Sequence, residues 1–180
     1  MKMDQIEKNL PVIDTDRFVL RPVRKSDAGL LAMYAGDDRV ARFTRSIPHP
    51  LPPGATEAFI ARALDPERTE DVWIMDGAAH DLSEVLGVIA LDRMDRKQSE
   101  IGYWVAPAFW NTGIASEAVG ALMAANPQKC KTIFASVFQD NPGSARVLTN
   151  AGFEYIGDAE AFSVARGAQV ATWTYLKKLG

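Results

Sequence analysis

Residues 110–115 have the composition of an anion-binding loop, and they read Trp110, Asn111, Thr112, Gly113, Ile114 and Ala115. Residues 100–106 before them are rich in aromatic and β-branched types, which is typical of a strand, and Pro107 cannot continue a central ladder. Apolar side chains then recur at helical spacing through residues 114–125. A helix N-terminus presents unpaired N–H groups and the positive end of the helix dipole, and Gly113 has no Cβ to block an anion. The sequence therefore predicts that a phosphate or pyrophosphate binds here.

Ser144 is the second candidate for chemistry, because its hydroxyl lies one turn inside another predicted helix. Asn141 and Pro142 give that helix an N-cap and a proline at its first position, and Gly152 gives it a C-terminal cap. Asn141 is therefore expected to cap this helix.

The remaining reactive residue types have no recognisable partners. Cys130 is the only cysteine, so no internal disulfide forms, and a structural role is expected for it. His49 and His80 lie in predicted loops without metal-ligand spacing, so we expect no metal. Neither Gly-x-x-x-x-Gly-Lys nor Gly-x-Gly-x-x-Gly occurs, which argues against nucleotide hydrolysis and dinucleotide binding.

A framework of strands and helices must position these residues. Short connections join the strands predicted at 71–75, 85–91 and 100–106, which indicates an antiparallel meander. A helix over 113–125 before a strand at 132–138 indicates a parallel pair at that point. The other predicted elements are a strand at 17–23, a helix after Ser26-Asp27, a proline-dense loop at 47–54, a helix at 56–64, and strands at 153–157 and 170–176.

The composition predicts one domain over residues 1–180, with residues 1–14 as a leader. Hydrophobic residues make up 47% and charged residues 24%, which is ordinary for a globular protein. The net charge of −3 argues against nucleic acid or an anionic membrane as the main partner. No stretch is apolar and long enough for a membrane helix, and the start lacks a signal-peptide pattern. We therefore expect a cytoplasmic protein.

Two segments together resemble the GNAT superfamily of acyl-CoA-dependent N-acetyltransferases, and particularly its ribosomal-protein-alanine N-acetyltransferase-like (Rim-type) branch. Residues 100–118 are similar to that branch's strand, pyrophosphate loop and helix start, and residues 141–153 to its Asn-x-x-Ser helix ending in Gly-Phe. Residues 15–22 look like its opening strand. The resemblance implies a mixed α/β (α+β) fold, with a twisted, mostly antiparallel sheet of about seven strands flanked by four helices. It further implies that this sheet is splayed between its fourth and fifth strands, where acetyl-CoA binds.

The resemblance also implies the reaction, which is direct attack of a primary amine on the thioester of acetyl-CoA in a ternary complex. Glu100 is then the favoured proton acceptor and Asp92 the alternative, whereas a solvated strand-end charge is the plain interpretation of Glu100. Ser144 would lie near the thioester sulfur and stabilise or protonate the leaving thiolate. Backbone N–H groups near Val105 and Ala106 would polarise the thioester carbonyl, and Asn141 would contact the pantetheine arm as well as cap its helix.

The loop departs from the family in one respect, because many relatives carry a basic or Gln side chain there. Trp110, Asn111 and Thr112 are uncharged. The pyrophosphate would therefore depend on the N–H groups of residues 111–115, on the helix dipole, and on Arg or Lys from elsewhere. Trp110 itself either contacts the ligand or packs in the core.

The sequence leaves the acceptor open. A protein or peptide N-terminus is favoured, because an α-amino group of pKa near ~8 is more readily neutral than a lysine near ~10.4. An amino acid, a polyamine or an aminoglycoside is the alternative, and an acidic cleft would favour the polycations. The chain could instead be a non-catalytic acyl-CoA sensor, or an adaptor without coenzyme affinity. Acyl-chain length is open, and the protein is expected to be a monomer or a homodimer, since the last strands leave a sheet edge.

Overall fold

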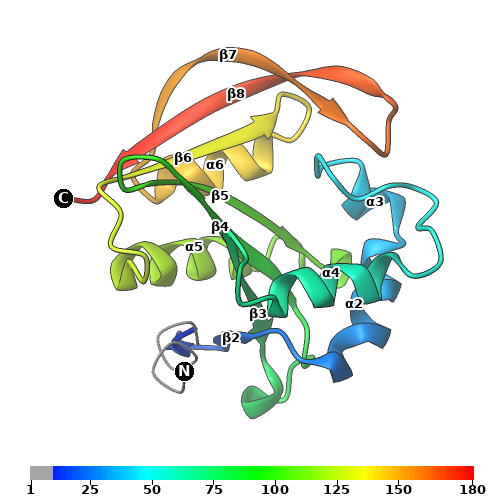
Figure 1. Cartoon of the computed structure of the whole chain (residues 1–180). Helices are drawn as coiled ribbons and strands as arrows, with labels where there is room; N and C mark the ends of the chain where they lie inside the picture. The colour runs from blue at the N-terminus through cyan, green and yellow to red at the C-terminus, as the bar shows by residue number, and fades with distance from the viewer. Residues whose placement is uncertain (1–9) are drawn as a thin grey trace.

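The computed structural model describes residues 10–180, which form one twisted sheet with helices on both faces (Figure 1). The strands are β1 (Ile13–Asp14), β2 (Val19–Pro22), β3 (Glu70–Asp76), β4 (Gly87–Met94), β5 (Gln98–Val105), β6 (Thr132–Phe138), β7 (Glu154–Ser163) and β8 (Ala168–Lys178). The α-helices are α2 (Ala28–Ala35), α3 (Asp38–Ala41), α4 (Ala55–Leu64), α5 (Ile114–Ala125) and α6 (Pro142–Asn150). Single 3₁₀ turns cover Lys25–Asp27, Ala78–His80 and Pro107–Phe109.

The sheet has the strand order β1-β2-β3-β4-β5-β6-β8-β7, and its centre is splayed. All neighbours are antiparallel except β5 and β6, which pair in parallel only where residues 98–101 face residues 132–135. Beyond that point β5 continues to Val105 and β6 to Phe138 without pairing to each other. The two halves of the sheet therefore diverge, and the predicted splay between these two strands is confirmed.

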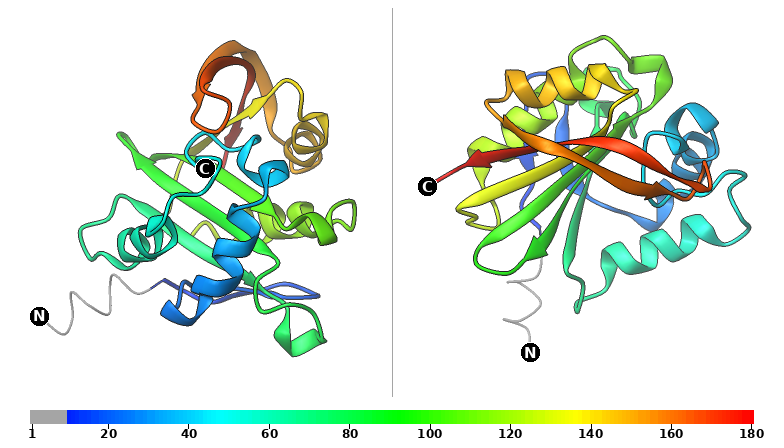
Figure 2. Two further views of the ribbon diagram at one scale, coloured as in Figure 1. Left: turned by 90° about the vertical axis from the view of Figure 1, so that its right-hand side faces the viewer. Right: turned by 90° about the horizontal axis from the view of Figure 1, so that it is seen from above.

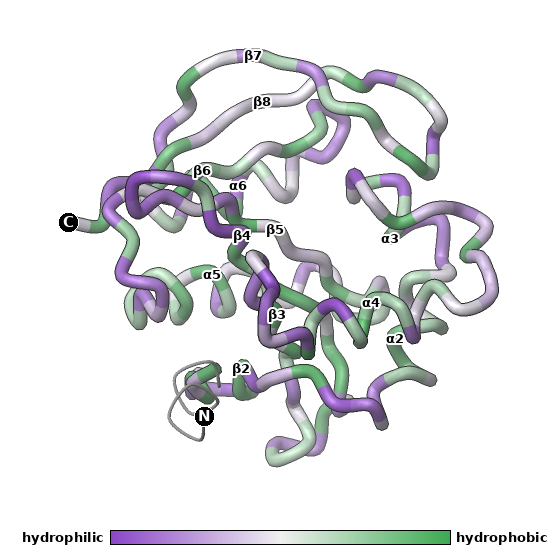
Figure 3. The backbone as a smooth tube through the Cα atoms, in the orientation of Figure 1, coloured by the Kyte–Doolittle hydropathy of each residue, from purple (hydrophilic) through white to green (hydrophobic). Residues whose placement is uncertain are grey.

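Each face of the sheet is covered by its own apolar cluster. On one face, α2 and α4 pack on β3 and β4 through residues that include Leu31, Ile60, Ile74 and Val88. On the other, α5 and α6 pack on the central strands, with Leu122 and Leu148 among the fully buried side chains. Figure 2 shows α4 and α5 on opposite sides of the sheet, and Figure 3 shows hydrophobic residues along the central strands and hydrophilic ones in the β4–β5 hairpin. This arrangement leaves the splayed ends of β5 and β6 as the opening between the layers.

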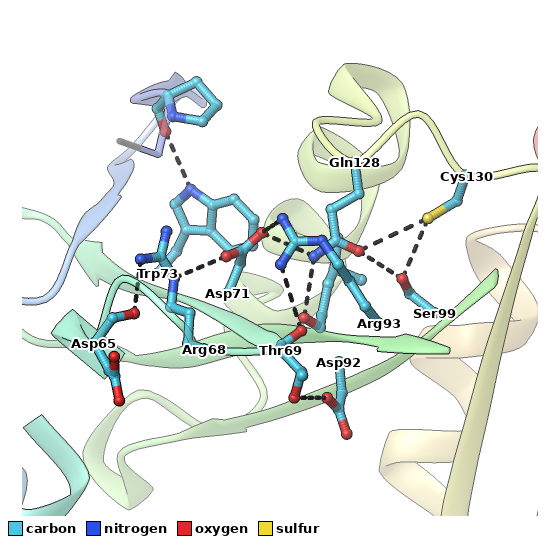
Figure 4. Close-up of polar contacts among 12 residues, drawn as sticks. Asp65, Arg68, Thr69, Asp71, Trp73, Asp92, Arg93, Ser99, Gln128 and Cys130 are labelled. Atoms are coloured by element: carbon cyan, nitrogen blue, oxygen red, sulfur yellow. Dashed lines mark hydrogen bonds and ion pairs between the residues drawn. The ribbon is translucent and has the colours of Figure 1, made fainter. Parts of the chain in front are cut away.

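The buried carboxylate of Asp71 lies near the other end of β5 and β6, where the two strands are still paired, and its hydrogen bonds stabilise that end (Figure 4). Asp71 is 2% exposed and accepts hydrogen bonds from Arg68 Nε at 2.9 Å, Arg93 Nη2 at 2.6 Å and Gln128 Nε2 at 2.9 Å. Ser99 of β5 donates to Gln128 Oε1 at 2.5 Å. Because Gln128 lies in the α5–β6 connection, this network ties that connection to β3, β4 and β5 at the closed end of the splay.

The predicted fold is confirmed, but three details of the prediction are wrong. The described residues contain eight strands, not about seven, because residues 13–14 of the supposed leader pair with residues 19–20. They contain five α-helices, not four, because Asp37 caps a single turn at Asp38–Ala41 by accepting from Arg39 N. The strand predicted to end at Gly157 has a β-bulge there and continues to Ser163. Residues 1–9 of the leader lie outside the described residues.

Candidate active site

A cleft of about 910 Å³ occupies the splay and extends under α2 and α4. Its lining includes eight of the ten residues predicted for the site, namely Val105, Trp110, Asn111, Gly113, Ile114, Ala115, Asn141 and Ser144. Thr112 and Glu100 are not among the lining residues. The structure therefore brings the pyrophosphate loop and the Ser144 helix to opposite walls of one cleft.

The loop before α5 is held open by turns and side-chain bonds. Asn111 and Gly113 have φ values of 61° and 81°, and Gly113 is the N-cap of α5. Thr112 Oγ1 donates to the Phe109 carbonyl at 2.5 Å. Within the described residues, no backbone N–H from 111 to 116 donates to a protein acceptor. These groups at a helix N-terminus have the arrangement that a phosphate needs.

The side chain of Trp110 links this loop to strand β5 and is not part of the core. Its side chain is 39% exposed and lines the cleft, and its Nε1 donates to the Val105 carbonyl at 2.7 Å. That bond joins the loop to the last residue of β5. The ring therefore fixes the corner between the strand and the loop while its face stays available to a ligand.

The two backbone groups predicted to polarise the thioester differ in their availability. Ala106 N–H donates to the Leu86 carbonyl at 2.8 Å, so the prediction for Ala106 is wrong. Successive N–H groups of a strand point to opposite sides, and the Val105 N–H therefore points away from β4, toward the splay. Val105 is thus the backbone donor at the end of β5 that a carbonyl in the cleft could reach.

Ser144 faces the tyrosine of β5 across the splay. Tyr103 Oη lies 2.8 Å from Ser144 Oγ and donates to the Ser144 carbonyl at 3.1 Å. Burial raises the pKa of Tyr103 to about 12, so the phenol is protonated at neutral pH. A hydroxyl pair that keeps its protons at neutral pH can orient and donate, but it cannot accept the proton of an amine. The sequence analysis missed Tyr103, although its place in the strand before the loop gave a signal.

Asn141 occupies the N-cap position of α6, as predicted, but its side chain makes no capping bond. The amide therefore remains available to the cleft that it lines. At the other end of this helix, Gly152 has φ 91° and the Phe153 N–H donates to the Leu148 carbonyl at 3.0 Å. This Schellman arrangement confirms the predicted C-terminal cap.

Three carboxylates form a row across the sheet at the level where β5 and β6 are still paired. Glu70 of β3 is opposite Asp92 of β4, which is opposite Glu100 of β5. Directly opposed residues project to the same face. Glu100 forms an ion pair with Arg45, whereas Asp92 accepts a hydrogen bond from Thr69 Oγ1 at 3.2 Å.

Glu70 is the carboxylate of this row that lines the cleft, and the sequence analysis missed it. Glu70 is an exposed residue at the edge of the cleft, and desolvation by the surrounding protein raises its pKa above the usual range for glutamate. The charge of Asp92 raises the pKa further, while Arg62 and Arg45 act against it. A carboxylate with a raised pKa in a cleft is a stronger base than an ordinary one.

The described residues offer no group of histidine, cysteine and carboxylate side chains that could hold a metal ion. Cys130 is 4% exposed and within hydrogen-bond distance of Ser99 Oγ, at 3.3 Å. That environment is structural, in line with the expectation for this thiol. None of the helices in residues 10–180 is long and apolar enough to cross a bilayer.

A family model and two relatives found by sequence assign the chain to the same family. The family model described as an acetyltransferase (GNAT) domain matches residues 17–154. The uncharacterized N-acetyltransferase YoaA of Bacillus subtilis is 28% identical over 174 residues, covering 92% of this chain and 95% of that protein. The uncharacterized N-acetyltransferase p20 of Bacillus licheniformis is 24% identical over 172 residues, covering 89% and 92%.

Solved structures share the fold at low sequence identity. The ribosomal-protein-S5-alanine acetyltransferase of Vibrio fischeri has a TM-score of 0.75 and 20% identity, covering 94% of this chain and 97% of that one. The microcin C7 self-immunity acetyltransferase MccE, solved with acetyl-CoA and AMP, has a TM-score of 0.77 and 17% identity, covering 91% and 93%. The chain therefore belongs to the GNAT family of acetyltransferases, and it is an acetyl-CoA-dependent N-acetyltransferase.

Proposed function

We propose that this protein transfers the acetyl group of acetyl-CoA to the α-amino group of a protein or peptide N-terminus. The observation that carries the proposal is the single cleft whose walls hold free loop N–H groups, the Tyr103–Ser144 pair and the Glu70 carboxylate. We further propose the ribosomal-protein-alanine (Rim-type) branch, which the Vibrio fischeri structure supports at the level of fold.

The residues suit a direct transfer without a covalent enzyme intermediate. The neutral amine attacks the thioester carbonyl, forming the C–N bond, and the C–S bond then breaks to release the thiolate of coenzyme A. The Val105 N–H would stabilise the oxyanion, and the Ser144 hydroxyl would turn its proton from Tyr103 Oη to the thiolate. A carboxylate of the row at residues 70, 92 and 100 would take the ammonium proton, directly or through water.

Our choice of base rests on which carboxylate of that row is free to accept a proton in the cleft. Glu100, favoured from the sequence, must leave its ion pair with Arg45 before it can accept a proton. Asp92 does not line the cleft. Glu70 lines the cleft and has a raised pKa, so we propose it as the base, with Glu100 as the alternative.

Charge in the cleft supports an acceptor with one cation. Arg39, Arg45, Arg62 and Arg146 line it, and Glu70 is the carboxylate among its described lining residues. Asp37 and Glu100 pair with Arg39 and Arg45, so the charge of the other two arginines outweighs that of Glu70. A polyamine or an aminoglycoside carries several cations, which this balance disfavours. A small amino acid remains the alternative acceptor, and an acyl-CoA sensor without turnover remains the alternative function. A reducing compartment such as the cytoplasm is the proposed location, since Cys130 is a buried free thiol.

Thermal unfolding with and without acetyl-CoA tests the donor first. A ligand at ~100 times its Kd adds about 2.7 kcal/mol, which raises Tm by roughly 5–10 °C for a chain of this size. AMP and NAD serve as controls. No shift at millimolar acetyl-CoA would overturn the proposed function.

Release of free coenzyme A thiol then tests the acceptor. We expect turnover with a peptide that has a free α-amino group, and none with the same peptide acetylated at its N-terminus. Turnover with spermidine but not with the peptide would contradict the proposed acceptor. Binding of acetyl-CoA without thiol release from any amine would indicate a sensor.

A further inference from the structure

Arg17 joins the turn between β1 and β2 to the loop before α5, 95 residues further along the chain. Its Nε donates to Glu117 Oε1 at 2.8 Å, and its backbone N–H donates to Glu117 Oε2 at 2.9 Å. Its Nη1 donates to the Thr112 carbonyl at 2.8 Å. The same guanidinium therefore holds both the first turn of α5 and the residue that precedes Gly113.

Glu117 makes this contact important for an anion at the loop. Burial raises the pKa of Glu117, but hydrogen bonds from Thr15 and Arg17 outweigh burial and hold the pKa below its usual range. The carboxylate is therefore ionised at neutral pH. An unpaired carboxylate in the first turn of α5 would repel a diphosphate bound at that helix N-terminus. Pairing with Arg17 offsets this repulsion.

The guanidinium also lies directly against the loop backbone. Its Nη2 is 3.5 Å from the position that a Cβ on Gly113 would occupy. Among the residues that the structure describes, Nη2 donates to none. The loop residues Trp110, Asn111 and Thr112 bring no charge of their own. Arg17 thus places the basic group nearest to Gly113 that the contacts identify.

We propose that Arg17 is a positioning residue for acetyl-CoA: it fixes the backbone of residues 112–113 and neutralises Glu117, so that the loop binds the diphosphate without a basic side chain of its own. The inference rests on the proposed function, because it concerns the loop that would bind acetyl-CoA. It requires the fork of a guanidinium, because one group must reach both Glu117 and the Thr112 carbonyl.

The test compares Arg17→Gln and Arg17→Lys with the wild type, using two acetyl donors. Acetyl-CoA carries the diphosphate, whereas S-acetylpantetheine has the same thioester without diphosphate or nucleotide. We expect Arg17→Gln to raise the KM for acetyl-CoA by about tenfold and to leave the KM for S-acetylpantetheine within about twofold. Arg17→Lys should restore less than half of the loss on a logarithmic scale, because a single ammonium cannot make both contacts.

Arg96→Gln is the matched control, since Arg96 precedes β5 and the loop follows the opposite end of that strand. It should change neither KM. Equal loss with both donors, accompanied by a lower Tm without ligand, would overturn the inference in favour of a role in folding alone. Unchanged acetyl-CoA affinity in Arg17→Gln, or full rescue by lysine, would also overturn it. A wild type that fails to bind acetyl-CoA would instead overturn the proposed function, and this inference with it.

Discussion

Glu70 and Glu100 lie in one row of carboxylates but are held differently. Glu100 is neutralised by Arg45, and Glu70 opens to the cleft with a raised pKa. A general base must be deprotonated to act, so activity rises as the pH rises through the pKa of the base. Because the pKa of Glu70 is raised, we expect the acid limb of kcat/KM above the usual ~4.3 of glutamate.

Amide replacements of the three carboxylates distinguish the general base from the carboxylate that pairs with Arg45. Glu70→Gln should lower kcat/KM by roughly a hundredfold and remove the acid limb. Glu100→Gln should lower it by less than about tenfold, because its main effect is to release Arg45. Asp92→Asn is the comparison from the same row: it should retain the rate at neutral pH and move the acid limb to lower pH, because the charge of Asp92 raises the pKa of Glu70. A profile in which only Glu100→Gln loses the limb would identify Glu100 as the base.

The residues missed from the sequence act through register or through contacts between distant segments. Glu70 becomes a candidate only when the β3–β4–β5 register places it beside Asp92 and Glu100. Arg17 could not be predicted as a partner of the loop, because only the packing of β1 beside α5 brings the two segments together. By contrast, Gly113 and Ser144 could be predicted, because strand-to-helix and helix-cap patterns are local in sequence.

At the scale of elements, the β7–β8 hairpin reaches across the open end of the cleft to the segment after α3. Val164 N–H donates to the Arg45 carbonyl at 3.1 Å, and Arg166 Nε donates to the Arg42 carbonyl at 2.8 Å. Arg166 also pairs with both oxygens of Asp140, at 2.6 and 3.0 Å. Since Asp140 directly precedes Asn141, one guanidinium connects the segment after α3 to the start of the Ser144 helix.

Removal of this contact should affect acceptor binding more than the binding of acetyl-CoA. Arg166→Ala is expected to raise the KM for the acceptor by about tenfold while the KM for acetyl-CoA changes by less than about twofold. Hydrogen exchange should accelerate in residues 42–47. Lys178→Ala removes an exposed cation at the far end of β8 and should have neither effect. Equal changes in both KM values would show that the hairpin supports the whole fold instead.

The length of the first strand of this hairpin could not be predicted from the sequence. The strand predicted at 132–138 is confirmed to the residue, because its apolar run is bounded by polar residues on both sides. Strand β7 is exposed along most of its length, so it carries no burial pattern, and the bulge at Gly157 looked like its end. Pairing to β8 extends it, and pairing between distant segments has no local signature.

At the scale of the whole molecule, a buried ion cluster joins β2 and the 3₁₀ turn Lys25–Asp27 to β3. Arg21 is 3% exposed and donates to Asp27 at 2.8 and 3.0 Å and to Asp76 at 2.6 Å. Asp27 also accepts from the Arg24 N–H at 2.8 Å. Asp27 is the N-cap of α2, and none of the residues in this cluster lines the cleft, so stability and activity can be changed separately.

Acid titration should expose the contribution of that cluster. Burial alone would raise the pKa of Asp27, but its bonds to Arg21 and Arg24 hold it below the usual range. A lowered pKa contributes stability above the unfolded value near ~3.9, and this stability is lost as the pH falls through the folded value. The free energy of unfolding should therefore fall as the pH falls below about 4. Asp27→Asn should show a smaller fall.

The same variant should be less stable than the wild type at pH 7. Removing one partner of a buried pair costs about 3–5 kcal/mol, and we expect the lower end because Arg21 keeps Asp76. Urea unfolding at pH 7 and at pH 3 measures both effects, with Asp95→Asn in the β4–β5 hairpin as the exposed control. An Asp27→Asn protein as stable as the wild type at pH 7 would show that desolvation of the pair cancels its attraction. If the fall in its free energy of unfolding between pH 7 and pH 3 also matched that of the wild type, the fall would come from other carboxylates with lowered pKa values, such as Glu117 and Asp140.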